Sequence, residues 1–289
     1  MLSNLKALIR RAYVYHRSVE INRWLEDLRR TPRALEPLRL TRFGRKAFSQ
    51  SDEDGMILEI FNRIGAQSRT FVEFGVEDGV ECNTALLLVG GWEGLWMDAS
   101  ARHVSRLRAR QGDAVARGAL ETRLASVNAE NIDGLLAQWS GGSPSAPAEI
   151  DLLSIDIDGN DYWVWQAIKS VSARVVVIEY NATYPPSIDF VRAYDPAARW
   201  RRDDYFGASL TSLEKLGRQL GYALVGCSLS GANAFFVRND NLTGPDGTPR
   251  FHAPYTAEEH YEPPRYQLTW LLAGHPPRFG KNAAPGIPS

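Results

Sequence analysis

The middle of the chain alternates short apolar runs with stretches of helical periodicity. Apolar residues three or four positions apart predict helices, whereas short runs of β-branched and aromatic residues predict buried strands. Five such runs stand between predicted helices, at 71–74, 95–98, 124–127, 150–156 and 174–179. Two more, at 222–226 and 234–237, flank a Ser-Gly turn. The pattern predicts an α/β fold: a Rossmann-like, doubly wound, mostly parallel sheet of seven strands with an antiparallel last strand.

The two ends of the chain differ from this alternating middle. Residues 5–30 have helical periodicity, and nine of the sixteen prolines follow residue 240. We therefore divide the chain into a basic helical N-terminal extension (1–47), a central domain (48–240) and a proline-rich C-terminal extension (241–289). The last of these should be mostly irregular, apart from a short apolar piece at 268–272.

Charge is distributed unevenly along the chain. Residues 1–46 hold twelve Lys or Arg and four acids, a local net charge of +8, whereas the whole chain has a formal net charge of −1. A solvated helix face explains this excess; contact with an anionic surface or substrate is the alternative. The helix itself would pack on the domain or on a second copy of the chain in a homo-oligomer, and composition does not choose between these. The near-zero total gives no reason to expect a nucleic-acid partner.

Cysteine content and hydropathy bear on the compartment. Cys82 and Cys227 are far apart and lack the spacing of metal ligands, and two thiols in 289 residues suggest a reducing compartment. No apolar run approaches the roughly 20 residues that cross a bilayer. We therefore expect a cytoplasmic protein without a transmembrane segment.

Residues 70–79, TFVEFGVEDG, read as a buried strand followed by a glycine turn. A strand, a turn between Gly75 and Gly79, and a helix would present backbone N–H groups to a ligand. The turn lacks the G-x-G-x-x-G of dinucleotide sites. It carries four carboxylates: Glu73, Glu77, Asp78 and Glu81. These repel a diphosphate but tolerate an ammonium and a sulfonium, which favours S-adenosylmethionine. Asp98, which ends the next predicted strand, is placed to accept hydrogen bonds from ribose hydroxyls.

A second group of acids follows the run at 150–156. The sequence D-I-D-G from Asp156 resembles a calcium loop, but its glycine stands at the fourth position instead of the sixth and Ala167 occupies the twelfth. We exclude that kind of site. Glu179 ends the neighbouring predicted strand, so its carboxylate should lie near those of Asp156 and Asp158. These three residues could hold Mg²⁺, or they could act as a general base and its orienting groups.

Several short motifs occur in a recognisable order. They are Ser49-Gln50 before E-D-G, then E-F-G-x-x-D-G, G-W-E-G-L-W-M-D, S-I-D-I-D-G-N-D-Y-W, V-V-V-I-E-Y-N and G-A-S-L-T-S-L-E-K-L-G. Over about residues 48–240 the chain thereby resembles class I S-adenosylmethionine-dependent methyltransferases of the FkbM-like kind. Proteins of that kind are often sugar O-methyltransferases.

The resemblance implies roles for individual residues. Those matched to the family's cofactor site are Glu73, Gly75, Gly79, Asp98, Asn128 and Ala129. The first three would hold the methionine part, the fourth the ribose, and the last two would flank the adenine. Asp156 would face the sulfonium and the acceptor. The family pattern often reads D-V-E-G where this chain has D-I-D-G, which leaves the role of Asp158 open.

These observations predict an enzyme, an S-adenosylmethionine-dependent O-methyltransferase. Its acceptor would be a hydroxyl of a sugar, a glycoconjugate or a related natural product, with Asp156 and Asp158 as catalytic carboxylates and Mg²⁺ as an optional second cofactor. The alternative is a non-catalytic nucleoside-binding module that docks a partner through the basic N-terminal helix. Metal-dependent oxygen chemistry is disfavoured because the sequence lacks a two-histidine, one-carboxylate set.

Overall fold

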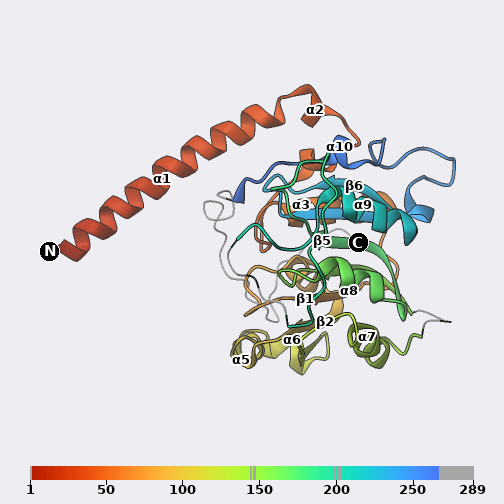
Figure 1. Ribbon diagram of the computed structural model, residues 1–289. Coiled ribbons are helices and arrows are strands. Elements are labelled where there is room, and N and C mark those ends of the chain that lie inside the picture. The colour runs from red at the N-terminus through yellow and green to blue at the C-terminus, as the bar shows by residue number, and fades with distance from the viewer. Residues whose placement is uncertain (1, 144, 146–147, 198–199, 201–202, 267–289) are drawn as a thin grey trace.

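The centre of the protein is a seven-stranded sheet in the order β3-β2-β1-β4-β5-β7-β6 (Figure 1). The computed structural model describes residues 2–143, 145, 148–197, 200 and 203–266. The strands are β1 (Thr70–Phe74), β2 (Glu93–Asp98), β3 (Leu120–Leu124), β4 (Ala148–Ile155), β5 (Val171–Glu179), β6 (Tyr222–Cys227) and β7 (Asn233–Arg238). β7 is antiparallel to both β5 and β6, and the other neighbours are parallel. The predicted fold class is confirmed.

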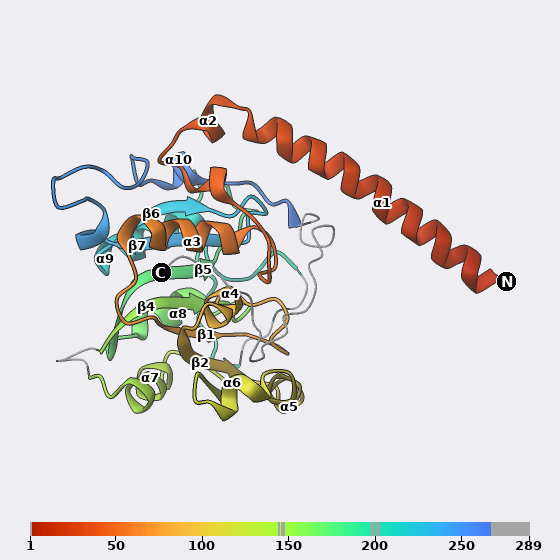
Figure 2. The same cartoon turned by 180° about the vertical axis from the view of Figure 1, so that it is seen from behind.

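Helices cover both faces of the sheet (Figure 2). The helices are α1 (Leu2–Arg29), α2 (Pro32–Leu35), α3 (Glu53–Ile64), α4 (Ala85–Val89), α5 (Ala101–Arg110), α6 (Gly112–Ala116), α7 (Ile132–Ser140), α8 (Asp161–Ala167), α9 (Leu210–Gln219) and α10 (Ala257–His260). Side chains alternate along a strand. Phe71 therefore joins an apolar cluster with α3 to α6, whereas Val72 and Phe74 join a second cluster with α7, α8 and α9. The sheet is thus buried from both sides, which explains its continuous apolar strands.

The predicted third strand is present, but it begins four residues earlier than expected. The predicted bounds near 124–127 are wrong: β3 spans Leu120–Leu124 and pairs with β2 from Gly94↔Leu120 to Asp98↔Leu124. As the edge strand it is buried on alternate positions only, and Glu121 is exposed. The apolar residues beyond it, Ala125 and Val127, pack against the second cluster after the strand has ended. A partly buried loop therefore has the apolar character expected of a strand.

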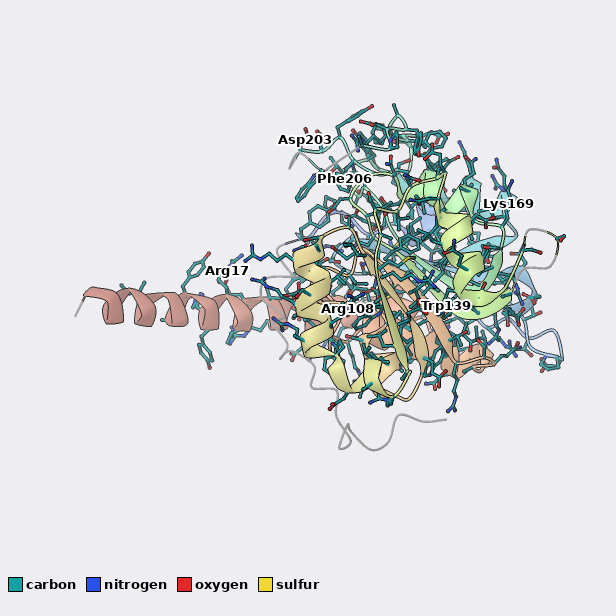
Figure 3. All side chains as sticks on the ribbon, turned by 90° about the horizontal axis from the view of Figure 1, so that it is seen from below. Arg17, Arg108, Trp139, Lys169, Asp203 and Phe206 are labelled. Atoms are coloured by element: carbon teal, nitrogen blue, oxygen red, sulfur yellow. The ribbon has the colours of Figure 1, made fainter. Side chains whose placement is uncertain are left out.

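The predicted N-terminal helix is confirmed as α1 (Leu2–Arg29), followed by the short α2 (Pro32–Leu35). Figures 1 and 2 show α1 extending away from the sheet, and Figure 3 shows Arg17 on it. Its C-terminal part contacts the domain, where Ile21 and Leu25 pack with Leu229. Whether the remainder binds a second copy of the chain stays a prediction.

The described part of the C-terminal extension returns over the central domain. The hydroxyl of Tyr180 donates to the carbonyl of Glu262 (2.6 Å), and that of Tyr261 donates to the carbonyl of Ala182 (2.6 Å). The extension is thereby fastened beside the end of β5. The apolar piece predicted at 268–272 lies outside the described residues. Within the described ranges, no helix combines the length and the hydrophobicity that a membrane span requires.

A buried ion pair joins β5 to its surroundings. Arg174 Nη1 lies 2.8 Å from Asp151 Oδ1 in β4, and the two side chains are 1% and 0% exposed. The guanidinium also donates to the carbonyls of Gly65 (2.7 Å) and Ile64 (3.0 Å) and to Asn241 Oδ1 (2.7 Å). One cation therefore connects two central strands, the end of α3 and the start of the C-terminal extension.

We expect Arg174→Met to lower the free energy of unfolding by about 3–5 kcal/mol, because Asp151 would remain buried without its counter-charge. Urea denaturation followed by circular dichroism measures this loss. The matched control is Arg218→Met, since the Arg218 side chain is 70% exposed in its ion pair with Glu214; its effect should stay within about 0.5 kcal/mol. Equal losses in the two variants would contradict this assignment.

Candidate active site

The turn after β1 brings three strand ends together. Gly75 has φ 82°, and a Cβ on it would lie 1.4 Å from the carbonyl oxygen of Asp156, which follows β4. Its N–H donates to the carbonyl of Met97 in β2 (3.0 Å). Gly79 has φ 77°, and a Cβ there would approach Trp96 to 3.2 Å. Both positions require glycine, because conformation and close approach exclude a side chain at Gly75 and strain one at Gly79.

Glu73 is buried within β1, 4% exposed, and its carboxylate is held by protein donors. It accepts hydrogen bonds from the N–H groups of Asn83 (2.8 Å) and Thr84 (3.0 Å), and from the hydroxyls of Thr84 (2.5 Å) and Ser154 (3.3 Å). Burial raises the pKa of this carboxyl group, while these hydrogen bonds oppose the rise. Glu73 therefore anchors the start of α4. Its predicted contact with the methionine part of a cofactor would be additional to this role.

Asp98 supports the same turn from the end of β2. One carboxylate oxygen accepts from the N–H of Glu77 (2.9 Å), and the other accepts from the N–H of Ser100 (2.7 Å) and lies 3.3 Å from His103 Nδ1. Glu77 has a positive φ of 47°. Burial raises the pKa of the Glu77 carboxyl group, and the nearby His103 partly offsets this rise. Asp98 thus lies beside the turn, as a ribose-binding residue would, while one carboxylate oxygen binds an N–H group of the turn and the other binds the N-cap residue of α5 (Ala101–Arg110).

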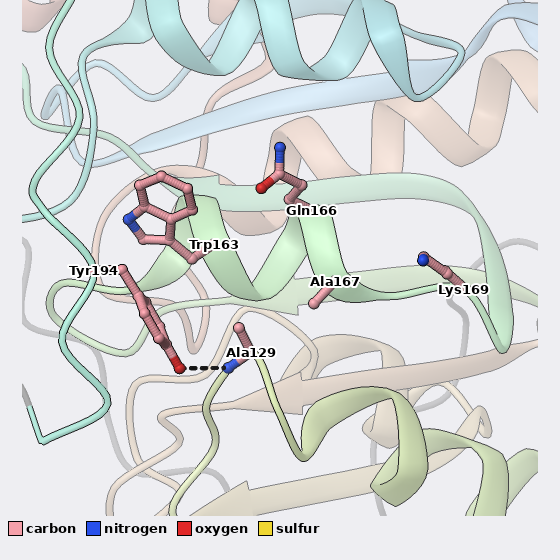
Figure 4. Close-up of a pocket in the computed structure, with 6 residues that line it drawn as sticks. All are labelled: Ala129, Trp163, Gln166, Ala167, Lys169 and Tyr194. Atoms are coloured by element: carbon pink, nitrogen blue, oxygen red, sulfur yellow. Dashed lines mark hydrogen bonds between the residues drawn. The ribbon is translucent and has the colours of Figure 1, made fainter.

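The two residues expected beside the adenine occupy the loop after β3. Asn128 and Asn131 exchange two hydrogen bonds between backbone N–H and side-chain oxygen, each 2.9 Å long. The N–H of Ala129 donates to the hydroxyl of Tyr194 (3.3 Å). Ala129 borders a cavity of about 500 Å³ (Figure 4). Its lining residues are Ala129, Trp163, Gln166, Ala167, Lys169 and Tyr194. Aromatic rings with a few polar groups suit the binding of a flat or ring-shaped ligand.

Three carboxylates meet where β4 and β5 end. Asp156, Asp161 and Glu179 each place one carboxylate oxygen within 4.8 Å of the other two. Asp156 and Glu179 were expected to lie together. The third member is Asp161, whereas Asp158 is exposed and has a φ of 59°. Asp161 was not predicted from the sequence, although it stands in the same acidic motif, because the turn at Asp158 decides which acid faces inward.

Proximity and burial change how these acids titrate. Asp161 accepts from the N–H groups of Ile157 (2.8 Å) and Gly159 (2.9 Å), yet burial still raises its pKa to about 6. Burial, followed by repulsion from neighbouring carboxylates, raises the pKa of Asp156 and that of Glu179 well above the ordinary values. Oε2 of Glu179 is buried and has no hydrogen-bond partner among the described residues. The cluster therefore favours a proton or another cation in its midst.

The comparisons with known proteins concern overall structure. No protein-family model and no curated protein sequence matches the chain. The methyltransferase domain of bacterial CtHen1-C is 12% identical, with 65% of this chain and 97% of that chain covered and a TM-score of 0.41. The O-methyltransferase from Bacillus cereus in complex with S-adenosylhomocysteine is 16% identical, with 76% and 88% covered and a TM-score of 0.37.

A further similar structure is the bifunctional kinase-methyltransferase WbdD, which is 16% identical. The match covers 63% of this chain but only 38% of WbdD, with a TM-score of 0.37. These neighbours are methyltransferases, at identities of 16% or lower and TM-scores below 0.5. The fold assignment for this chain therefore rests on its own strand order and register, and the FkbM-like resemblance stays a prediction.

We expect Glu179→Gln to stabilise the protein at high pH. A carboxyl group whose folded pKa is raised contributes stability below its unfolded pKa, and this contribution is lost as the pH rises through the folded pKa. The substitution removes one negative charge. Among the described contacts, it breaks no hydrogen bond of the Glu179 side chain. At pH 8 the gain should be on the order of 1–2 kcal/mol, and it should shrink at pH 4–5.

Urea denaturation of wild type and variant over this pH range measures the difference. Glu258→Gln is the matched control, because Glu258 is exposed on α10 and outside the cluster. A gain that is independent of pH, or equal in the control, would refute the interpretation that the three carboxylates repel one another.

Proposed function

We propose that the protein is an S-adenosylmethionine-dependent methyltransferase. The observation that carries this proposal is the convergence of the glycine turn after β1 with three carboxylates at the ends of β4 and β5. Anionic groups around a tight glycine turn favour a cationic ligand over a diphosphate. Asp98 beside the turn and Ala129 at the edge of the cavity support positions for the ribose and the adenine.

The acceptor we propose is a hydroxyl of a sugar, glycoconjugate or related natural product. When bound, S-adenosylmethionine supplies a methyl group on a sulfonium and leaves as a neutral thioether. Methyl transfer of this kind depends chiefly on positioning, with a base to take the hydroxyl proton. Asp156 is the proposed base, because it lies against the glycine turn and its raised pKa makes it a better proton acceptor.

A divalent cation is a second proposed ligand of the same cluster. Hard oxygen donors are what Mg²⁺ prefers. The buried, unpartnered Oε2 of Glu179 fits such a role among the described residues. In place of the predicted set of Asp156, Asp158 and Glu179, the geometry supports Asp156, Asp161 and Glu179. A bound cation would lower the pKa of an acceptor hydroxyl and so share the work of the base.

Cofactor binding tests the proposal directly. We expect S-adenosylhomocysteine to bind the wild-type protein in isothermal titration calorimetry, and Gly75→Ala to weaken binding at least tenfold, because the Cβ displaces the Asp156 backbone. Gly134→Ala is the matched control, since nothing lies within 4 Å of a Cβ there. Absence of binding by the wild type would leave only a non-catalytic role for the module.

Turnover tests the proposed base. With labelled S-adenosylmethionine and a panel of nucleotide sugars and glycans, Asp156→Asn should reduce the rate by roughly 10²–10⁴-fold, the range typical of a lost general base. The rate of the wild type should rise with pH, because the base acts only when deprotonated and its pKa is raised. Asp158→Asn should have a smaller effect, since Asp158 is exposed. Full turnover by Asp156→Asn would exclude this mechanism.

A further inference from the structure

Arg192 is a buried cation beside the proposed active site. It lies on the segment between β5 and α9, where its backbone N–H donates to the carbonyl of Gly207 (2.9 Å) and Val191 forms an antiparallel bridge with Ala208. The N–H of Asn181, just past β5, donates to the carbonyl of Ala208 (2.8 Å). The segment is therefore fastened to the end of β5, and Arg192 is held close to the strand ends with 8% of its surface exposed.

The Arg192 side chain lacks the partners that a buried guanidinium normally has. Its Nε and Nη1 are buried without a hydrogen-bond acceptor, and no carboxylate of the described residues forms an ion pair with it. The guanidinium instead faces the Tyr205 ring, whose centroid is 5.7 Å from Cζ, and Gly159, where a Cβ would lie 2.6 Å from Nη1. Burying a charge unpaired is costly, because water no longer solvates it.

Three features show that the surrounding residues hold Arg192 in a defined position. The indole N–H of Trp163 donates to the carbonyl of Arg192 (2.9 Å), which fixes the backbone. Gly159 leaves the space that the guanidinium occupies. Its neighbour in sequence, Asn160, is 5% exposed and has an unpartnered Oδ1, while its Nδ2 donates to the carbonyl of Asp195 (2.8 Å). Among the described residues, two buried donors of Arg192 and one buried acceptor of Asn160 are therefore left without partners near the end of β4.

We propose that Arg192 binds an anionic group, a carboxylate or a phosphate, on the methyl acceptor. The planar guanidinium presents paired N–H donors that match these oxyanions in a bidentate geometry. The acid cluster of Asp156, Asp161 and Glu179 would repel the same group, so the acceptor would be oriented with its anion on Arg192 and its hydroxyl toward Asp156. This inference rests on the proposed function, and it narrows the acceptor to acidic sugars or phosphorylated compounds.

A purely structural role is the competing interpretation, in which the charge of Arg192 only offsets the field of the acids. The two differ in a measurable way. If the role is structural, removal of the guanidinium lowers stability and leaves anion affinity unchanged. If Arg192 binds the acceptor, removal weakens anion binding and leaves the cofactor affinity intact.

Calorimetric titration of the full chain with sodium phosphate and, separately, sodium acetate at constant ionic strength tests the proposal. We expect a dissociation constant on the order of 1 mM for at least one of them, from two charge-assisted hydrogen bonds. Arg192→Gln should weaken that binding at least tenfold, and Arg192→Lys, which keeps the charge but not the planar fork, should give an intermediate loss. Arg218→Gln on the exposed face of α9 should change nothing.

The outcomes distinguish the proposal for Arg192 from the proposed methyltransferase function. Saturable binding of phosphate alone indicates a phosphorylated acceptor, and binding of acetate alone a carboxylated one. No binding of either by the wild type, or equal affinities in wild type and Arg192→Gln, would overturn the assignment of Arg192; if Arg192→Gln fails to fold, equal affinities in wild type and Arg192→Lys would overturn it. S-adenosylhomocysteine titrated in parallel tests the proposed function, because its failure to bind the wild type would refute that function regardless of the anion result.

Discussion

Repulsion among the carboxylates of Asp156, Asp161 and Glu179 is the constraint that determines the chemistry at the carboxyl end of the sheet. At separations within 4.8 Å, two like charges at an effective dielectric constant of about 20 repel by roughly 3 kcal/mol. The parallel pairing of β4 with β5 nevertheless holds the three together, and the N–H groups of Ile157 and Gly159 relieve only Asp161. The fold thus maintains a local excess of negative charge that a cationic ligand, a metal ion or a proton would relieve.

The protein satisfies buried charges elsewhere. Glu73 receives four hydrogen bonds around the start of α4, and Arg174 is neutralised by Asp151 and surrounded by carbonyl oxygens. Among the described residues, Nε of Arg174 also lacks a hydrogen-bond partner, but that guanidinium has an ion pair and three further acceptors, whereas Arg192 has two unpartnered nitrogens and no ion pair. The buried, unpartnered atoms of Glu179 and Arg192 lie at the carboxyl end of the sheet, where a bound ligand would complete their hydrogen bonds.

The sequence predicted those parts of the fold and site that depend on local pattern. Strands buried on both faces are continuous apolar runs, so β1, β4 and β5 were predicted correctly. The edge strand β3 has a polar outer face, and its predicted position was therefore too late in the sequence. The glycine turn was recognised because positive φ values at Gly75 and Gly79 need that residue. Asp161 was missed because the backbone turn at Asp158 decides which acid faces Glu179, and the approach of Arg192 was missed because it joins segments distant in sequence.

The bridge between Val191 and Ala208 has an evolutionary consequence. It closes the chain between these residues at a point that is itself fastened to the end of β5. The entropy of closing such a loop grows only logarithmically with its length, by about 0.6 kcal/mol for each doubling. An insertion between the two bridge residues therefore adds little to the entropic cost of folding. The length of this segment can then vary between related chains while the sheet and its charged edge persist unchanged.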